Sequence, residues 1–426
     1  MRKNIWIFNH YASNMFKDQA GRHYWIAQNL IKQGYNPTIF CASTIHNSNE
    51  IINTGNKKFI LEKTDSIPFV FVKTPEYLTN GRKRIENMIA FYKNLFPVAK
   101  DYASIHGKPD LILASSVHPL TLVAGIKLAK KFDVQCICEV RDLWPETLVE
   151  YGTIKKDSLF ANLLYLGEKW IYKKADRLIF TMEGGKSYIN DKDWSQKHGG
   201  PIDINKIYHI NNGVDLTTYN KQKLEIQYVD TELEDKGIFK IIYAGSLGKA
   251  NSTNYILETA KIIQDKGYLD IKFLIFGSGP LKKEMEKYCK EYDLKNVSFK
   301  GRVDKTFIPN ILSKGNLNIF TGQKVDLYKF GLSLNKMFDY MASGKPTISN
   351  IECGFDNIEK YKCGFTVKGG NAEYIVEGIL KFYSMSSNEY ANYCSNALKA
   401  AEDFDYKYLT SRLINIINNG DKEGKL

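Results

Sequence analysis

The first half of the chain alternates short apolar runs with helical patterns. An apolar run at residues 4–10 (NIWIFNH) is followed by a polar loop, a helical pattern at 22–34 and a second apolar run at 37–43. Strand, loop, helix and strand in this order predict a βαβ unit. Further strands are expected at residues 67–72, 110–116, 134–140, 176–182 and 206–212. The alternation predicts a parallel sheet with helices on both faces.

A polar stretch at residues 215–237 interrupts the pattern and is interpreted as a linker region. The alternation then restarts, and two doubly wound halves in tandem predict an α/β chain. Their ligand crevice is expected between the halves, at the carboxyl ends of both sheets. The second-half strands are expected at residues 239–245, 271–279, 296–301, 317–322, 346–350 and 363–367, and the helices at 251–267, 281–293, 307–315 and 330–346.

Composition places the chain among globular proteins of more than one domain. Of its 426 residues, 43% are hydrophobic and 25% are charged. No apolar stretch reaches the length of a membrane span and no charged-then-apolar leader opens the chain, so export is not expected. The seven cysteines are scattered and odd in number, which favours reduced core thiols in a cytoplasm over a disulfide framework or a zinc site.

The net charge of +12 fits three kinds of partner: nucleic acid, an anionic membrane surface or a phosphorylated substrate. Because the charge is spread along the chain, a disordered nucleic-acid-binding arm is disfavoured.

Two helical patterns bear on the membrane alternative. The pattern at residues 80–100 either packs on its own domain or presents a basic, aromatic patch to a membrane. The pattern at residues 157–176 is expected to bury its apolar face in the core. The basic and apolar positions of the first pattern are Arg82, Lys83, Arg84, Ile85, Met88, Ile89, Tyr92 and Phe96.

The stretch FGLSLNKMFDYMASGKP at residues 330–346 predicts an anion site at a helix start. With Ser333 as N-cap, the next three amides are unpaired donors, and Lys336 adds a full charge within that turn. Asp339, one turn further on, is suited to accept hydrogen bonds from ribose hydroxyls, so the pattern fits a nucleotide diphosphate with its sugar. The alternative is a capped helix with an i,i+3 ion pair between Lys336 and Asp339.

Three more strand ends in the second half carry phosphate-binding signals. Glycines let backbone amides approach a phosphate, and a lysine or arginine neutralises its charge. The signal in YAGSLGKAN is weak when taken alone, and FGSGP also fits an ordinary turn, but all of the signals are expected on one edge of the second sheet. The residues are Gly245, Gly248 and Lys249 in YAGSLGKAN, Gly277 and Gly279 in FGSGP, and Arg302 in KGRVD.

In the first half, Gly21 and Arg22 stand at a helix start that is expected to face the crevice. Arg141 and Asp142 follow the strand VQCICEV, where they could hold a sugar hydroxyl or accept its proton, or form a loop ion pair. His118 follows the strand DLILASS and lines the same edge, unless it is polar surface.

Two further kinds of site are not favoured in the first half. A DxD metal site at residues 191–193 is disfavoured because it lies in a polar loop. No serine or cysteine nucleophile with a partnered base is evident.

These residues together resemble the retaining glycosyltransferases of family 4, in the GT-B architecture. The resemblance is strongest to the bacterial polysaccharide branch that includes N-acetylfucosamine transferases of surface-antigen assembly. It extends from residue 4 to about residue 350, in the family's order. The matching pieces are NHYASNMFKDQAGRHYWIAQNLIKQGYNPTIFCAS, EVRDLWPETLVEYG, INNGVD, YAGSLGKAN, FGSGP and FGLSLNKMFDYMASGKP.

The resemblance implies two Rossmann-like doubly wound domains that face a deep cleft. Residues 1–220 are then the acceptor-binding domain and residues 221–403 the donor-binding domain, while the helix at 404–426 crosses back onto the first. FGSGP and GRVD would line the base pocket, SLNK would grip the diphosphate, and Asp339 matches the second carboxylate of the family's E-x7-E element. The implied donor-binding residues are Gly21, Ser246, Gly248, Lys249, Asn251, Gly277, Gly279, Arg302, Val303, Ser333, Leu334, Asn335, Lys336 and Asp339.

The chain departs from the family pattern at several of these positions. Leu334 stands where the typical branch has proline, and Ser246 and Asn251 align with the arginine and lysine that usually cradle the diphosphate. The first carboxylate of E-x7-E is absent. Arg141 and Asp142 occupy the place of the family's histidine and aspartate near the donor sugar.

The function implied is transfer of a sugar, with retention, from a nucleotide-diphosphate donor such as UDP-N-acetylfucosamine to a lipid-linked saccharide in capsule or O-antigen synthesis. No metal or other cofactor and no nucleic acid are expected, and the enzyme would lie at the inner face of the cell membrane. The rivals are a sugar-nucleotide epimerase of the same architecture and a non-catalytic basic scaffold. Expected catalytic residues are Arg141, Asp142, Lys249 and Lys336, and expected acceptor-binding residues are Asn14, His118, Arg141 and Asp142.

Overall fold

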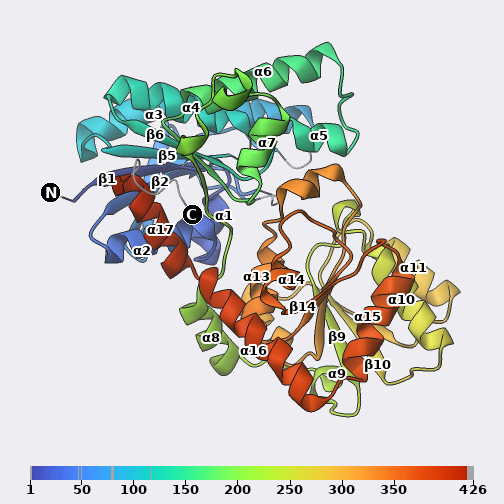
Figure 1. Ribbon diagram of the computed structural model, residues 1–426. Helices are drawn as coiled ribbons and strands as arrows, with labels where there is room; N and C mark the ends of the chain where they lie inside the picture. The colour runs from blue at the N-terminus through green and yellow to red at the C-terminus, as the bar shows by residue number, and fades with distance from the viewer. Residues whose placement is uncertain (1, 47, 49, 78–80, 117, 420–426) are drawn as a thin grey trace. The chain divides into compact units, whose positions relative to one another are not determined.

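The structure, a computed structural model, describes residues 2–46, 48, 50–77, 81–116 and 118–419 (Figure 1). The chain forms two compact units. Unit 1 comprises the residues up to Asn211 together with those from Leu409 onward, and unit 2 comprises Asn212–Tyr408. The division between the units therefore lies nine residues before the 220/221 boundary expected from the sequence. Residues 420–426 of the expected last helix lie outside the described residues.

Unit 1 contains an eight-stranded sheet in the order β3-β4-β2-β1-β5-β6-β7-β8. All neighbouring strands are parallel except β3 and β4, so the expected parallel sheet is present. The half-exposed edge strand β3 was not expected from the pattern. The strands are β1 (Asn4–Phe8), β2 (Asn36–Ala42), β3 (Phe59–Thr64), β4 (Ile67–Val72), β5 (Leu111–Ser115), β6 (Gln135–Val140), β7 (Arg177–Phe180) and β8 (Ile207–His209).

Helices cover both faces of this sheet, because its central strands are apolar on both sides and must be buried on both. Helices α3, α4 and α6 lie side by side over one face, and α2 and α17 lie over the other (Figure 1). The last helix is held on unit 1 by Arg412, which donates to the His209 carbonyl (2.9 Å), and by Arg177, which donates to the Ile416 carbonyl (2.6 Å). The helices are α1 (Ser13–Asp18), α2 (Arg22–Lys32), α3 (Arg82–His106), α4 (Pro119–Phe132), α5 (Glu146–Glu150), α6 (Leu159–Lys174), α7 (Gly185–Asp191) and α17 (Tyr406–Asn419).

Unit 2 contains a six-stranded parallel sheet in the order β11-β10-β9-β12-β13-β14. From β9 the chain builds outward to β10 and β11, then returns to place β12 on the other side of β9. The carboxyl ends of β9 and β12 therefore form the topological switch point, where open α/β sheets bind their ligands. The strands are β9 (Phe239–Ala244), β10 (Ile271–Phe276), β11 (Val297–Gly301), β12 (Leu317–Phe320), β13 (Thr347–Ser349) and β14 (Gly364–Thr366).

Two buried apolar clusters cover the two faces of this second sheet. One is built on α12, α13 and α16, the other on α10 and α15. The polar stretch interpreted as a linker instead forms α8 and α9 within unit 2, because Asp215 and Asp230 cap their first turns and Tyr219 is buried. The helices are α8 (Leu216–Glu225), α9 (Thr231–Glu234), α10 (Asn254–Asp265), α11 (Lys282–Glu291), α12 (Ile308–Ser313), α13 (Asn335–Ser343), α14 (Asn357–Tyr361), α15 (Ala372–Tyr383) and α16 (Ser387–Asp403).

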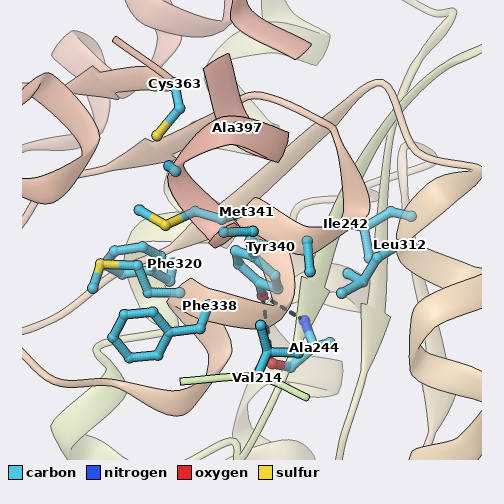
Figure 2. Close-up of a cluster of buried hydrophobic side chains, with 14 of the residues drawn as sticks. Val214, Ile242, Ala244, Leu312, Phe320, Phe338, Tyr340, Met341, Cys363 and Ala397 are labelled. Atoms are coloured by element: carbon cyan, nitrogen blue, oxygen red, sulfur yellow. Dashed lines mark hydrogen bonds between the residues drawn. The ribbon is translucent and has the colours of Figure 1, made fainter. Parts of the chain in front are cut away.

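Tyr340 fixes helix α13 against the switch point. Its hydroxyl accepts the Ala244 amide of β9 (2.9 Å) and lies 3.2 Å from the Ile319 carbonyl of β12. Figure 2 shows the Tyr340 ring inside the apolar cluster with its oxygen directed at Ala244. Because β9 and β12 pair only at Ile241–Leu317 and Ile242–Asn318, before the ends of both strands, one hydroxyl can serve both. The first turn of α13 is therefore held in a fixed position relative to β9.

A buried carboxyl attaches helix α6 to unit 1. Glu168 accepts hydrogen bonds from Tyr172 (2.7 Å) and Tyr188 (2.9 Å), and burial raises its pKa to about 8. The folded state therefore holds this proton more tightly than the unfolded state does. The contribution of Glu168 to the free energy of unfolding is therefore complete below the ordinary pKa of about 4.5, and it is lost as the pH rises toward 8.

Replacing Glu168 by glutamine is expected to flatten the pH dependence of unfolding. The variant keeps the side-chain shape but does not titrate. Between pH 5 and pH 8 its free energy of unfolding should therefore fall less than that of wild type, with a difference of about a few kcal/mol. Urea denaturation at several pH values measures the difference. Glu62→Gln, on the exposed surface of β3, is the matched control. Equal slopes for wild type and Glu168→Gln would contradict the assignment.

Candidate functional site

The loops after β9, β10 and β11 are joined to one another by backbone hydrogen bonds. Gly245 donates to the Phe276 carbonyl (2.9 Å), and Gly277 donates to the Gly301 carbonyl (2.7 Å). A Cβ on Gly277 would lie 1.8 Å from the Gly245 carbonyl oxygen, and one on Gly279 would lie 2.3 Å from that of Leu247. These glycines are therefore required for close packing of the loops, and the expected strand ends do meet at one edge of the sheet.

Lys336 extends from the first turn of α13 to the end of β9. Its ammonium donates to Asn251 Oδ1 (2.8 Å), lies 3.2 Å from the Tyr243 hydroxyl and stands over the Tyr243 ring. A Cβ on Gly245 would lie 2.9 Å from Lys336 Nζ. The helix-start signal and the glycine-rich signal, 85 residues apart along the chain, thus form one site.

The i,i+3 ion pair between Lys336 and Asp339 does not form. Among the described residues, no carboxylate lies within ion-pair distance of Lys336. Burial lowers the pKa of Lys336 to about 8 and raises the pKa of Asp339 to about 7. Within the described residues Lys336 is therefore a cation that contacts only the neutral side chains of Tyr243 and Asn251.

The sequence predicts Ser333 as the N-cap of α13, and this prediction is wrong. The helix begins at Asn335 with Leu334 in the N-cap position, and Ser333 is bound to Asn212 instead. Asn212 donates its amide to the Ser333 hydroxyl (2.9 Å) and its side chain to the Ser333 carbonyl (2.7 Å). Since Leu334 has no capping side chain, the first-turn amides of Asn335 and Lys336 lack an intrahelical acceptor.

The remaining expected donor residues follow the same strands but differ in exposure. Ser246 and Lys249 are exposed beside Gly248, and Asn251 is tied to the loop by donating to the Ser246 carbonyl (2.9 Å). Arg302 is exposed after the edge strand β11. The last of these residues, Val303, packs against the core of unit 2.

In unit 1, Arg22 is buried rather than exposed at a crevice. Its side chain is 2% exposed and lies 2.7 Å from Glu139, which also contacts His23 (3.0 Å). Arg22 donates as well to the carbonyls of Asn211 (2.5 Å) and Ile210 (3.0 Å), while Gly21 precedes it with φ of 110°. Burial alone would raise the pKa of Glu139, but Arg22 and His23 hold it well below the ordinary value. This network joins α2, β6 and the chain after β8.

His118 is completely buried at the start of α4, so the polar-surface interpretation of this residue is wrong. His10 lies between it and Asn87, with Nδ1 at 2.6 Å from His118 Nε2 and Nε2 at 2.7 Å from Asn87 Oδ1. Asn87 Nδ2 donates to the Pro75 carbonyl (2.5 Å), so its Oδ1 must accept from His10 Nε2–H. His10 Nδ1 then accepts from His118 Nε2–H.

This proton assignment leaves His118 Nδ1 as an acceptor, and no described residue donates to it. Burial lowers the pKa of His118 to about 3, so the ring is neutral at pH 7. His118 can therefore accept a hydrogen bond from a hydroxyl at neutral pH without becoming charged.

Arg141 and Asp142 do not form the alternative loop ion pair in the part of the chain that the structure describes. The Arg141 amide donates to Ser116 Oγ (2.9 Å), and the Arg141 Nε is buried with no hydrogen-bond acceptor in the described part of the chain. Asp142 is exposed. Asn14, on α1, donates to the His46 carbonyl (3.4 Å), and its Oδ1 accepts from none of the residues that the structure describes.

No group of three or more His, Cys, Asp or Glu side chains among the described residues is arranged to hold a metal ion. Asp193, in the DxD stretch, lies 3.6 Å from His198 instead.

Sequence reasoning missed several residues that build these sites. Tyr243, Tyr340 and Asn212 position Lys336 and α13, and Glu139 and His10 organise unit 1. Asn212 lies in the stretch INNGVD and Tyr243 in YAGSLGKAN, so both were inside quoted motifs. Nothing in the sequence showed which partner each of them contacts.

Two family models match the chain and together cover most of it. "Glycosyltransferase Family 4" matches residues 24–218, and "Glycosyl transferases group 1" matches residues 227–400. The probable glycosyltransferase WbjE of Pseudomonas aeruginosa is 22% identical over 251 residues, which span 58% of this chain and 58% of WbjE. The chain thus aligns with little more than half the length of this relative.

Solved structures match nearly the whole chain. HepE of Anabaena, solved in complex with UDP and glucose, has a TM-score of 0.67 at 13% identity and covers 97% of this chain and 99% of its own. WaaG, a glycosyltransferase involved in lipopolysaccharide biosynthesis, has a TM-score of 0.66 at 12% identity and covers 97% and 100%. At these identities the likeness shows the fold, which is the GT-B fold expected from the sequence.

Proposed function

We propose that this chain, a GT-B glycosyltransferase with a family 4 domain followed by a group 1 domain, transfers a sugar from a UDP-linked donor. The observation that carries the proposal is the ammonium of Lys336 at the end of β9, which has no anionic partner among the residues described. The family models support a nucleotide-sugar donor, and the UDP in the HepE structure supports uridine as its base.

The diphosphate of the donor is proposed to bind at the switch point of unit 2. The uncapped amides of Asn335 and Lys336 and the positive end of the α13 dipole attract an anion there. Lys336 would lie against the leaving diphosphate, whose negative charge grows as the glycosidic bond breaks. Lys249, exposed in the segment that follows β9, adds a second cation. A divalent metal is not part of this proposal.

The nucleoside is proposed to extend from this point along the carboxyl edge of the sheet. Asp339, whose pKa burial raises to about 7, would accept hydrogen bonds from the ribose hydroxyls once ionised. The glycine turn at Gly277 and Gly279 brings backbone close to Gly245, and Arg302 follows the outer strand. These groups would surround the base.

In unit 1, the groups proposed to contact the acceptor have unused hydrogen-bonding capacity. His118 Nδ1, Asn14 Oδ1 and Arg141 Nε are buried and have no hydrogen-bond partner among the described residues. Asp142 is exposed beside Arg141 and could accept the proton of an attacking hydroxyl. The proposed route is attack on the face from which the diphosphate leaves, which retains the anomeric configuration, with a donor phosphate oxygen or Asp142 taking the proton.

The acceptor is proposed to be a lipid-linked saccharide in capsule or O-antigen synthesis, presented at an anionic membrane surface. The net charge of +12 and the likeness to WaaG support this part of the proposal. No described helix is long and apolar enough to cross a bilayer. An N-acetylamino sugar such as N-acetylfucosamine is the proposed donor sugar.

A panel of nucleotides is expected to identify the donor class by thermal shift. A ligand that binds only the folded state raises its stability, so UDP should raise the melting temperature by a few degrees at saturating concentration. Uridine, which has no phosphate, should have no effect, and GDP, ADP and CMP serve as base controls. An equal shift from uridine would contradict the diphosphate site, and an equal shift from GDP would contradict the choice of UDP.

An epimerase of the same architecture would act on the donor alone. Incubating enzyme with a UDP-sugar and no acceptor separates the two functions. Appearance of the epimeric UDP-sugar would contradict the transferase.

A further inference from the structure

Helix α6 exposes a continuous apolar stripe. Leu159 is 90% exposed, Leu163 is 64% and Leu166 is 65% exposed, and Trp170 is 39% exposed. The spacing of these four positions, i, i+4, i+7 and i+11, places them on one side of the helix. Phe160, 57% exposed, widens the stripe at its start.

The opposite side of α6 is the side that packs on the domain. Ala161, Glu168, Ile171 and Tyr172 are buried, and the Glu168 hydrogen bonds hold that side in place. The expectation that the apolar face of residues 157–176 forms core is therefore correct for this side of the helix and wrong for the exposed stripe. The helix has two apolar sides, and only the smaller one is needed to attach it to unit 1.

Lysines surround the exposed stripe. Lys155 and Lys156 precede the helix, and Lys169, Lys173 and Lys174 lie in its last turns. The segment 155–174 holds only two acidic residues, Asp157 and Glu168, and Glu168 is buried. An apolar stripe between two groups of like charges is typical of helices that lie in a lipid–water interface.

The neighbouring helix continues the same charge. Helix α4 packs beside α6 over the same face of the sheet (Figure 1). Its exposed side carries Lys127, Lys130 and Lys131, while its apolar residues are buried against β5 and β6. Lysines near an anionic surface add to the attraction one by one. The outer helical layer of unit 1 is therefore basic around the α6 stripe.

Helix α3, where the sequence placed the basic patch, is a weaker candidate. It is attached to its own unit through Asn87, Phe91 and Leu95, as one of the two open interpretations had it. Of its basic cluster, Arg84 donates to the Tyr11 hydroxyl (3.0 Å) and Arg82 pairs with Glu86. Its exposed apolar residues are Ile85 and Ile89 near its start and Ile105 near its end.

We propose that the α6 stripe docks on an anionic lipid bilayer, with the apolar side chains inserted among the acyl chains and the lysines on the headgroups. Lipid is favoured over a second copy of the chain because a two-fold contact would bring equal groups of lysines together. This inference adds the docking surface to the proposed function, which needs a membrane-borne acceptor. Its test does not depend on catalysis.

The test is flotation with lipid vesicles. Wild type should float with vesicles of phosphatidylcholine and phosphatidylglycerol in equal parts and remain unbound with pure phosphatidylcholine. Leu159→Ser/Leu163→Ser/Leu166→Ser, made at exposed positions, should lower the bound fraction at least tenfold. Ile85→Ser/Ile89→Ser on α3 is the matched control and should bind like wild type.

Three outcomes would overturn the inference. In the first, the wild-type protein does not bind the anionic vesicles. In the second, the triple variant binds them as well as the wild type does. In the third, light scattering shows that the wild type is a dimer and the triple variant a monomer. The UDP thermal shift, measured on the same proteins, reports on the proposed function separately. A triple variant that loses vesicle binding but keeps the UDP response supports docking by α6. Vesicle binding without any UDP response would remove the donor proposal and leave the docking surface intact.

Discussion

Lys336→Ala is expected to lower turnover with a UDP-sugar donor by a factor of about 10² to 10³. The ammonium is the charge closest to where the diphosphate is proposed to leave, and burial has already removed much of its water, as its lowered pKa shows. A hydrogen bond from a partly desolvated cation to a developing anion is stronger than the same bond in water. The effect should fall mainly on kcat, because the charge on the leaving group grows in the transition state.

The measurement compares initial rates of UDP release with acceptor, for wild type and variant, together with the UDP thermal shift. Lys290→Ala, an exposed lysine on α11, controls for the loss of one positive charge. Lys336→Ala also removes the donor to Asn251 Oδ1, so its own melting temperature is checked first. Turnover within a few-fold of wild type in a stably folded variant would exclude the diphosphate role.

Much of the fold and the outline of the donor site could be predicted because both depend on local patterns. Apolar runs bounded by glycine and polar residues became β9, β10 and β12, and parallel strands bring their carboxyl ends to one edge. That geometry alone placed Lys249, Gly277 and Arg302 on the same edge. The solved structures confirm the GT-B fold, and the two glycosyltransferase family models match the two parts of the chain in the expected order. Retention and the N-acetylamino sugar stay predictions.

What could not be predicted depends on partners far apart in the sequence. Ser333 has the composition of an N-cap, but Asn212, 121 residues away, binds it and the helix starts two residues later. The α6 stripe has the same periodicity as a core-facing helix, because periodicity shows that a helix has an apolar side and not what covers it. Arg22 at a helix start looked like a ligand-binding arginine, since no local pattern shows the buried carboxylate of Glu139.

Glu139→Gln is expected to destabilise unit 1 by about 3–5 kcal/mol, because it leaves the Arg22 guanidinium buried without its counter-ion. Both side chains are 2% exposed. The glutamine keeps the size of the side chain, so the loss reports on charge and hydrogen bonding rather than on a cavity. Glu139 also accepts from Ser115 (2.8 Å) and contacts His23, and the variant weakens both contacts.

Urea denaturation at pH 7, followed by circular dichroism, measures the loss for Glu139→Gln. Glu286→Gln, in a surface pair with Lys282 at 3.5 Å, is the matched control and should change stability by less than about 1 kcal/mol. Arg22→Met combined with Glu139→Gln should recover part of the lost stability, because the uncompensated charge is then gone, although the carbonyls of Ile210 and Asn211 lose their donor.

The effect of Glu139→Gln on stability should also depend on pH, with a definite sign. The pKa of Glu139 lies well below its ordinary value of 4.5, so its stabilisation is complete above pH 4.5 and is lost as the pH falls through the lowered pKa. The difference in free energy of unfolding between wild type and Glu139→Gln should therefore become smaller in acid. A difference that stays constant or grows in acid would show that the buried charge pair is not its cause.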